Sequence, residues 1–416
     1  VRESYEWLSA RYEAIVLEGA GSPVEINLKS RDIVNMRMAA LADAQCILVA
    51  DIDRGGVFAS LLGTFELLEP EERARIRGFI INKFRGDLAL LLPGIRQMEE
   101  RVRKPCLGVV PFLEDLHLEE EDSLGLPILS ADWPADRSSS PHRALRRAVV
   151  ALPSLSNFTD FDPLRAEPTV SLSYCRTPDA LRLADVIILP GSKETVKDLH
   201  WMRAGGLDRA VLDHHARGGL TVGICGGMQM LGRRILDPGR VESAGSAPGL
   251  GLLEMETKLN PQKITTMAHG TIKDARLFGQ TCITGRLRGY EIHVGETTYS
   301  PGARPFAVLA RGGEAGGHAG GVLEDGCVSE DERTFGTYLH GIFDNDAFRH
   351  AFLNSARACC SLSSGEPFAC LDERKERELD RLAEAVSRSV DIQAIFRWMG
   401  LERRSETGVL KELEKG

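Results

Sequence analysis

The chain has 416 residues, of which 43% are hydrophobic and 27% are charged. This composition is ordinary for a globular protein, and the length is sufficient for two or three domains. The formal net charge of −9 argues against a nucleic acid partner, because phosphates favour a basic surface. No apolar run approaches the roughly 20 residues that a membrane-spanning helix needs, so no membrane association is expected. Nine cysteines occur without CxxC pairs, which suggests neither a disulfide framework nor a zinc ribbon and favours the reducing cytoplasm.

The N-terminal part of the chain alternates short apolar runs with helical patterns. The runs that we predict to be strands are residues 14–17, 46–50, 78–81 and 106–110. Alternation of strands with helices is typical of βαβ units, which form parallel sheets. We therefore predict a first α/β domain over residues 1–130.

The rest of the chain is expected to contain a second α/β domain. The predicted linker, second domain and polar tail are residues 131–147, 148–399 and 400–416. The linker is rich in proline, serine and arginine, and strands are expected at 186–189 and 220–224. Apolar residues at helical spacing from 372 to 399 predict amphipathic helices that pack on this second domain.

The segment around Cys225 predicts a catalytic nucleophile. It reads TVGICGGMQML from Thr221 to Leu231, a strand that enters a helix through the pattern Gly223-x-Cys225-x-Gly227. Glycines on both sides of a nucleophile allow the tight turn known as a nucleophile elbow. The helix N-terminus that follows favours the thiolate form of the cysteine. An isolated cysteine at a strand end is more often structural, but the elbow pattern reverses that expectation.

The turn after another predicted strand supplies candidate oxyanion donors. Residues 187–193 read IILPGSK, and a Pro-Gly turn can aim the backbone N–H groups of Gly191 and Ser192 at a tetrahedral intermediate. The N–H of Gly226 is the expected partner donor. One such donor is typically worth roughly a hundred- to a thousandfold in rate.

Two of the ten histidines are candidate general bases. His340 follows the strand-like run RTFGTYL and precedes Gly341, which is how α/β nucleophile sites usually present their base. His293, in the segment GYEIH, is the rival candidate. A lone histidine is more often structural, so this prediction depends on pairing His340 with Cys225.

Together these motifs resemble the class I glutamine amidotransferases. The narrower resemblance is to the cobyric acid synthase family of corrinoid amidases, and it extends over nearly the whole chain. It is carried by residues 156–163 (SNFTDFDP), 289–293 (GYEIH) and 337–343 (TYLHGIF). The resemblance implies that Cys225 forms a glutamyl thioester while His340 shuttles the proton, which releases ammonia from glutamine.

One position departs from the general class I pattern. The glutamate usually found two residues after the histidine is Ile342 here. This resembles the corrinoid amidases, in which a cysteine and a histidine are expected to act as a dyad without an orienting acid. Tyr290, Glu291 and His293 are further site candidates, and the role of His293, at a domain interface or at the acceptor site, stays open.

Acidic residues follow two predicted strands of the first domain. Glu18 follows residues 14–17, and Asp51 and Asp53 follow residues 46–50. Each acid alone is equally well explained by a solvated helix cap. Acids at the ends of neighbouring parallel strands are nevertheless typical of a ligand crevice, and a carboxylate at a phosphate site is a suitable Mg²⁺ ligand.

These segments resemble the ATP-dependent ligase domain of the same family, which is related to dethiobiotin synthetase. The resemblance implies that Glu18 holds Mg²⁺ and that Asn82 and Lys83 lie near the adenine of ATP. Glu25 and Asp53 would lie toward the acceptor carboxylate. The family begins with a P-loop, a glycine-rich turn ending in Gly-Lys-Ser/Thr, and this sequence contains no such segment. We therefore expect a P-loop-type ligase domain that is truncated at its N-terminus and binds ATP poorly on its own.

The family resemblance predicts glutamine- and ATP-dependent amidation of a corrinoid. The expected acceptor is adenosylcobyrinic acid a,c-diamide, amidated at its b, d, e and g propionates in cobalamin biosynthesis. Three alternatives stay open: a cobyrinic acid a,c-diamide synthase, which amidates acetates; a lipid II amidase; and a non-catalytic remnant of the partition-ATPase type. The intact elbow disfavours the last of these. The sequence is also compatible with a homo-oligomer.

Overall fold

The computed structural model describes most of the chain, which divides into two compact units. The described residues are 1–114, 116, 118, 133, 142–242, 245–273, 276–281, 285–312, 322–365 and 370–401. The first unit consists of Val1–Leu118 together with the segment that begins at Lys375. The second unit is Glu119–Arg374. Apart from residues 400 and 401, the predicted polar tail lies outside the described residues.

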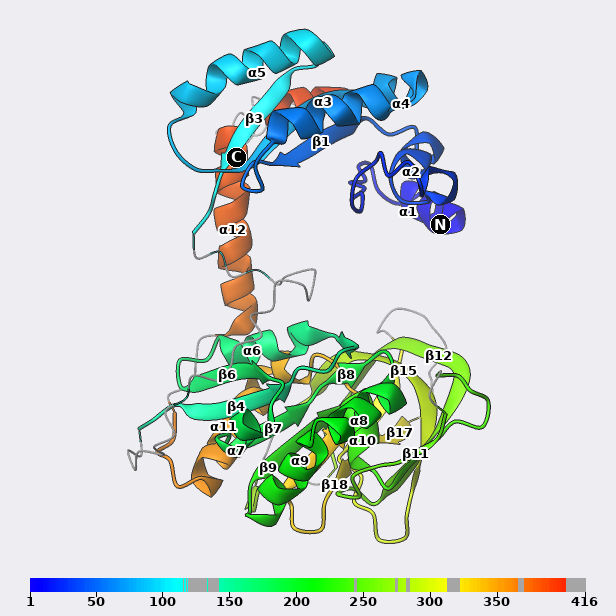
Figure 1. The fold of residues 1–416 in the computed structure, drawn as a ribbon, viewed down its shortest axis with the longest axis vertical. Helices are drawn as coiled ribbons and strands as arrows, with labels where there is room; N and C mark the ends of the chain where they lie inside the picture. The colour runs from blue at the N-terminus through cyan, green and yellow to red at the C-terminus, as the bar shows by residue number, and fades with distance from the viewer. Residues whose placement is uncertain are drawn as a thin grey trace, which may run out of the picture. The chain divides into compact units, whose positions relative to one another are not determined.

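The first unit contains a three-stranded parallel sheet (Figure 1). Its strands run in the order β1 (Cys46–Asp51), β2 (Ile76–Phe84) and β3 (Cys106–Pro111). The helices α3 (Val57–Leu67) and α5 (Leu88–Val102) connect these strands and bury apolar side chains against β2. Three of the four predicted strands of this part are thereby confirmed, together with the βαβ connectivity.

Capping signals in the sequence set where two helices of this unit begin. The helix α4 (Pro70–Arg75) starts with proline and has a capping box between Glu69 and Glu72, which satisfies backbone N–H groups at the helix start. Asp87 accepts a hydrogen bond from the N–H of Ala89 at the start of α5, and this cap replaces a missing intrahelical partner. The remaining helices that precede β1 are α1 (Arg2–Ser9), η1 (Lys29–Arg31) and α2 (Met36–Leu41).

The predicted strand at residues 14–17 is wrong. Residues 14–20 have no regular secondary structure, and Val16 is 89% exposed. A strand depends on hydrogen bonds to a neighbouring strand, and within the described residues β1 pairs only with β2. The apolar run has β propensity but no partner, so propensity alone does not make it a strand.

The C-terminal helices pack on the sheet of the first unit, so their predicted position on the second domain is also wrong. They are α12 (Leu371–Ser389) and α13 (Ile392–Trp398). Val390 and Ala394 bury apolar surface against Leu107 of β3. The N–H of Asp391 donates to the carbonyl of Leu107 at 2.8 Å. The helical periodicity predicts an apolar face correctly, but it does not specify which sheet covers that face.

The second unit is built around a six-stranded sheet. The strand order is β18-β19-β9-β7-β4-β6, and all neighbours are parallel except β18 and β19. The bounds are β4 (Leu145–Val150), β6 (Val170–Cys175), β7 (Val186–Leu189), β9 (Leu220–Ile224), β18 (Cys327–Val328) and β19 (Thr334–Thr337). The strands predicted at 186–189 and 220–224 are confirmed as β7 and β9. Both units therefore have the predicted α/β class.

β4 begins inside the predicted linker. Leu145 and Arg147 are fully buried, and the guanidinium of Arg147 lies 5.1 Å from the centre of the Phe352 ring. Burial lowers the pKa of Arg147 to about 9. Arg146 and Arg147 give this segment the polar composition that predicted a linker. The long aliphatic stem of an arginine can nevertheless be buried in a strand. The rest of the predicted linker, apart from Trp133 and residues 142–144, lies outside the described residues.

Helices cover the sheet of the second unit. They are α6 (Asp162–Arg165), α7 (Pro178–Arg182), α8 (Thr195–Ala204), α9 (Leu207–Ala216), α10 (Gly226–Leu231) and α11 (Asp346–Cys359). Figure 1 shows α8 and α9 side by side in front of the sheet and α11 behind it. None of the described helices is both long and apolar enough to cross a membrane.

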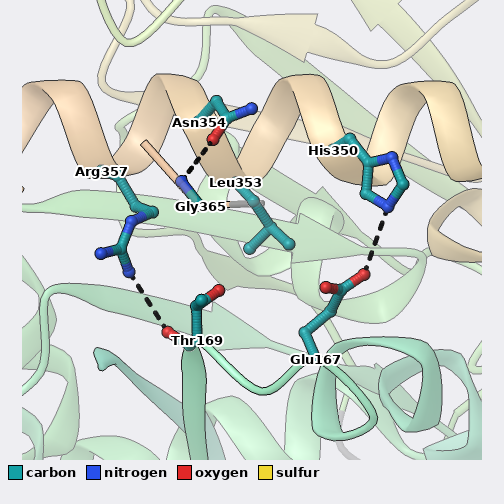
Figure 2. A pocket seen from close by; sticks show the side chains of 7 residues that line it. All are labelled: Glu167, Thr169, His350, Leu353, Asn354, Arg357 and Gly365. Atoms are coloured by element: carbon teal, nitrogen blue, oxygen red, sulfur yellow. Dashed lines mark hydrogen bonds and ion pairs between the residues drawn. The ribbon is translucent and has the colours of Figure 1, made fainter. Parts of the chain in front are cut away.

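Polar contacts join α11 to the residues before β6 (Figure 2). His350 Nε2 lies 3.5 Å from Glu167 Oε1, and Arg357 Nη1 donates to the carbonyl of Thr169 at 3.3 Å. These residues line a small pocket in which the polar groups pair with one another. The contacts therefore serve to hold α11 on the sheet.

A second sheet, antiparallel except for the parallel pair of β10 and β12, forms the other part of this unit. Its strands are β10 (Arg234–Leu236), β11 (Ala247–Pro248), β12 (Met255–Ile272), β15 (Leu287–Tyr299), β16 (Ala307–Arg311) and β17 (Val322–Asp325). The shorter elements are β5 (Leu155–Ser156), η3 (Phe158–Phe161), β8 (Gly191–Ser192), β13 (Arg276–Leu277), β14 (Gln280–Thr281) and η4 (Ile342–Asp344). Tyr290 of β15 forms an antiparallel bridge with His340, and this bridge joins the antiparallel sheet to the end of the central one.

Candidate active site

Cys225 lies at a sharp turn between β9 and α10. Its φ and ψ angles are 50° and −110°, a conformation that costs energy for a residue with a side chain. Its N–H donates to the carbonyl of Thr337 in β19 at 2.8 Å. A Cβ atom on Gly227 would lie 1.9 Å from the carbonyl oxygen of Leu189, so only glycine allows this approach of α10 to β7. The predicted elbow geometry is therefore present at Cys225.

His340 lies beside Cys225 and is held by a buried carboxylate. Its Nδ1 lies 2.7 Å from Oδ2 of Asp160, and the N–H of the next residue, Gly341, donates to Oδ1 of Asp160 at 2.8 Å. Burial alone would lower the pKa of His340, but the hydrogen bond to Asp160 and the interaction with Cys225 raise it to about 10. The sequence predicted a dyad without an orienting acid, and the structure places the carboxylate of Asp160, from a different part of the chain, against His340.

The predicted oxyanion donors lie together next to this pair. β8, which consists of Gly191 and Ser192, pairs with β5. A Cβ atom on Gly191 would lie 3.4 Å from Cε1 of His340, and one on Gly226 would lie 2.9 Å from the backbone nitrogen of Ser192. The backbone of all three donors is thus adjacent to the base or to one another.

Tyr290 lines the site from β15. Its hydroxyl accepts a hydrogen bond from Nδ2 of Asn157 at 2.8 Å. Its ring stacks on the His340 ring, with centroids 5.2 Å apart and planes 16° apart. Two residues further along β15, the carbonyl of Ile292 lies 3.6 Å from Sγ of Cys225. This strand therefore forms a wall of the site.

His293, the rival base, points to a different partner. Its Nε2 lies 3.4 Å from Glu291, and its ring stacks on Tyr338 at 3.8 Å. Arg311 donates two hydrogen bonds to Glu291, at 2.6 and 3.0 Å. Burial alone would raise the pKa of Glu291, but the contacts with His293 and Arg311 lower it to about 2. This arrangement favours His340 as the base, because the structure directs His293 toward Glu291.

The first unit brings four of the other predicted residues to one edge of its sheet. Lys83 Nζ lies 2.9 Å from Asp51 Oδ2, and Asn82 Oδ1 accepts the N–H of Lys83. Asp53 pairs with Arg85 at 3.2 Å. Burial alone would raise the pKa of Asp51, but Lys83 lowers it. Strand ends of a parallel sheet thus gather charged side chains, as the crevice prediction requires.

Glu18 and Glu25 are not part of this group. Both side chains are exposed and lie in segments without a strand or an α-helix. Within the described residues, no hydrogen bond or ion pair joins them to Asp51 or Asp53, and no group of three acids, histidines or cysteines could hold a metal ion. Mg²⁺ is usually held by one or two carboxylates together with substrate phosphates, so the Mg²⁺ site at Glu18 stays a prediction.

Comparison with known proteins places the chain in a family. Residues 147–348 match the CobB/CobQ-like glutamine amidotransferase domain, and residues 1–120 match an AAA domain. The cobyric acid synthase of Salmonella choleraesuis (strain SC-B67) is 48% identical over 394 residues, which cover 94% of this chain and 75% of that relative. The chain belongs to the cobyric acid synthase family.

The chain is also similar to a second cobyric acid synthase and, more weakly, to solved structures. The cobyric acid synthase of Salmonella typhi is 48% identical over 395 residues, with the same shares of each chain covered. Among solved structures, PurLQS from Thermotoga maritima aligns with a TM-score of 0.36 at 16% identity, covering 53% of this chain and 97% of that one. A glutamine amidotransferase from the same organism aligns with a TM-score of 0.33 at 15% identity, covering 62% and 99%.

Membership of the cobyric acid synthase family confirms the predicted family and shows that the chain is an enzyme of the glutamine amidotransferase class. The matched segment 147–348 includes Cys225, His340 and Asp160. Asp160 belongs to the SNFTDFDP segment that carried the resemblance, but no spacing rule connects it to a histidine 180 residues away. The segment was a signal for the family and not for the role of this residue.

Asp198 is a second residue that the sequence did not reveal. It is fully buried in α8, accepts the hydroxyl of Ser192 at 2.6 Å and accepts the N–H of Ser154 at 3.2 Å. It therefore ties β8, which carries two predicted oxyanion donors, to the residue that precedes β5.

Asp198→Asn is expected to lower kcat for glutamine hydrolysis about tenfold, with little change in KM. The amide nitrogen of the new side chain would face either the Ser192 hydroxyl or the Ser154 N–H, both of which are donors, so β8 would shift. Oxyanion donors that are out of place stabilise the transition state less. Steady-state kinetics of glutamate release would measure the effect, with Asp208→Asn on the neighbouring helix α9 as the control. An unchanged kcat in Asp198→Asn would contradict this assignment.

Proposed function

We propose that the second unit hydrolyses glutamine, with Cys225 as the nucleophile and His340 as the general base. The observation that carries this proposal is the position of Cys225 at a strained elbow, beside a buried histidine whose other ring nitrogen contacts a carboxylate. Such an arrangement supports acyl transfer through a covalent intermediate.

The first half of the reaction forms a thioester. The Cys225 thiolate attacks the side-chain carbonyl carbon of glutamine, and the backbone N–H groups of Ser192 and Gly226 stabilise the oxyanion. His340, protonated by the thiol, gives that proton to the leaving nitrogen, so the C–N bond breaks and ammonia is released.

The second half regenerates the enzyme. Water attacks the thioester carbon while His340 accepts its proton, and the C–S bond then breaks to release glutamate. One glutamine and one water thus give one glutamate and one ammonia, with Cys225 and His340 returned to their starting states.

We further infer that the first unit, with Val1–Leu118 as its main part, is the ATP-dependent ligase domain. Its match to an AAA domain and the charged group at its strand ends, which includes Asp51, Asp53 and Lys83, support this role. ATP would phosphorylate an acceptor carboxylate there, and ammonia would displace phosphate to form the amide. Asn82 would lie near the adenine, and Glu18 would hold Mg²⁺.

The proposed acceptor is adenosylcobyrinic acid a,c-diamide, amidated at its b, d, e and g propionates. The relatives that are cobyric acid synthases support this choice, while the CobB/CobQ-like domain is also compatible with cobyrinic acid a,c-diamide as the product. We place the reaction in the cytoplasm, where the free thiols of the described cysteines would persist.

A count of the amides added would test the acceptor. The protein would be incubated with ATP, glutamine and either adenosylcobyrinic acid a,c-diamide or cobyrinic acid, and the product masses compared. We expect four amides on the a,c-diamide. Two amides on cobyrinic acid, with none on the a,c-diamide, would support the runner-up instead, and glutamate release without any corrinoid amide would count against both.

A further inference from the structure

The carboxylate that contacts the base belongs to Asp160 of η3, and the strand β5 just before η3 pairs with the oxyanion strand β8. We propose that Asp160 is the positioning residue of the glutaminase site, and that it holds His340 in the tautomer and orientation needed to accept the Cys225 proton. This inference rests on the proposed hydrolysis of glutamine at Cys225. It assigns a third member to a site for which the sequence predicted only two.

The contacts of Asp160 determine which nitrogen of His340 carries a proton. An ionised carboxylate only accepts hydrogen bonds, and its two neighbours are Nδ1 of His340 at 2.7 Å and the backbone N–H of Gly341 at 2.8 Å. Nδ1 must therefore be the protonated nitrogen. Nε2 is hydrogen-bonded to no other group among the described residues and His340 interacts with Cys225, so the lone pair of Nε2 is available to the Cys225 thiol.

Burial strengthens the electrostatic interaction between the Asp160 carboxylate and His340. Asp160 is 4% exposed and His340 is fully buried, so water screens their interaction weakly. When Cys225 gives its proton to His340, the imidazolium forms directly against the Asp160 charge. The carboxylate therefore stabilises the charged state that nucleophilic attack requires, as well as the orientation of the ring.

The segment from β5 to η3, which includes Asp160, also fixes the distance from the base to the oxyanion donors. Residues Leu155 and Ser156 form β5, which pairs with the oxyanion strand β8. Asn157, with a left-handed φ of 53°, donates to the hydroxyl of Tyr290, whose ring stacks on His340. One short segment thus touches the oxyanion strand, the aromatic wall and the base, which is the placement expected of a positioning element.

Asp160→Asn changes the hydrogen bonding of this side chain without changing its volume, because the two side chains have the same shape. Both neighbours of Asp160 are donors, and an amide can accept from only one of them. If the amide oxygen keeps Gly341, the NH₂ group faces Nδ1 of His340, which must then lose its proton while Nε2 gains one. That tautomer cannot accept the thiol proton, and kcat is expected to fall by about 10²- to 10⁴-fold.

The pH dependence of kcat/KM distinguishes a positioning role from a purely structural one, because a purely structural role would leave it unchanged. The hydrogen bond to Asp160 raises the pKa of His340, so the imidazolium persists to higher pH and the alkaline limb of kcat/KM lies well above the ordinary histidine value of about 6.5. Asp160→Asn removes that effect, so the alkaline limb of its residual activity should move to lower pH. Asp160→Glu, which keeps the charge, should keep more activity than Asp160→Asn and an alkaline limb nearer to that of the wild type.

The experiment is glutamate release against pH for the full chain and these two variants. Asp185→Asn is the matched control: Asp185 is also buried and paired, through Arg143 at 2.6 Å, but it does not touch the site. We expect its kcat and alkaline limb to match the wild type. A wild-type alkaline limb near pH 6.5, which needs no variant to fold, would overturn the assignment. So would an Asp160→Asn enzyme with wild-type kcat and profile. If the wild-type protein released no glutamate from glutamine, that result would instead contradict the proposed function itself.

Discussion

Replacing Cys225 by alanine is expected to lower kcat for glutamine hydrolysis by about 10⁶-fold, the scale seen when a catalytic nucleophile is removed. The physical reason is that no other group in the site can form the thioester, so hydrolysis would depend on direct attack by water. The fold should be retained, because the substitution removes only the sulfur atom, whose described polar contacts are with His340 and with the carbonyl of Ile292 at 3.6 Å. Amidation that uses ammonium salt in place of glutamine should also be retained wherever the ligase reaction can be assayed.

Cys175 offers a matched control for this experiment. Its thiol is buried in the same unit, and burial raises its pKa to about 11, so it should not react at neutral pH. An electrophilic diazoketone analogue of glutamine should label the wild type and Cys175→Ala equally and should not label Cys225→Ala. Undiminished hydrolysis in Cys225→Ala would show that the nucleophile lies elsewhere.

Local patterns were sufficient to predict the nucleophile and its surroundings. The strands at 186–189 and 220–224 have the predicted bounds, because each is a buried β-rich run that ends in a glycine turn. Cys225 and His340 lie together because the elbow and the histidine follow neighbouring parallel strands, β9 and β19. Features determined by a few consecutive residues were therefore accessible from sequence alone.

The residues that support the site depend on contacts across the chain, and the sequence did not reveal them. Asp160 meets His340 over a separation of 180 residues, and Asp198 meets Ser154 over 44. In residue type and in neighbouring sequence, Asp160 and Asp198 look the same as solvent-exposed aspartates. The same limit explains the C-terminal helices, whose apolar residues, such as Ala394, were visible while their partner, Leu107 of β3, was not.

The elbow also makes a strong prediction about stability. Gly227→Ala is expected to destabilise the second unit by more than about 3 kcal/mol, the upper part of the range for single substitutions. The added Cβ would lie 1.9 Å from the carbonyl oxygen of Leu189 and 2.4 Å from its carbonyl carbon. Both atoms belong to the backbone of the central strand β7, so neither can rotate away. α10 would have to move off the sheet and would carry Cys225 out of the site.

A second glycine distinguishes this steric effect from the loss of glycine in general. Gly205 follows α8 with an ordinary φ of −89°, and a Cβ there would meet its nearest neighbour, the carbonyl oxygen of Trp201, at 3.5 Å. Gly205→Ala should therefore change stability by less than about 1 kcal/mol, because alanine fits that conformation. Urea unfolding followed by circular dichroism would compare the two variants with the wild type. If Gly227→Ala unfolded at the wild-type urea concentration and kept glutaminase activity, α10 could not pack on β7 as closely as the structure shows.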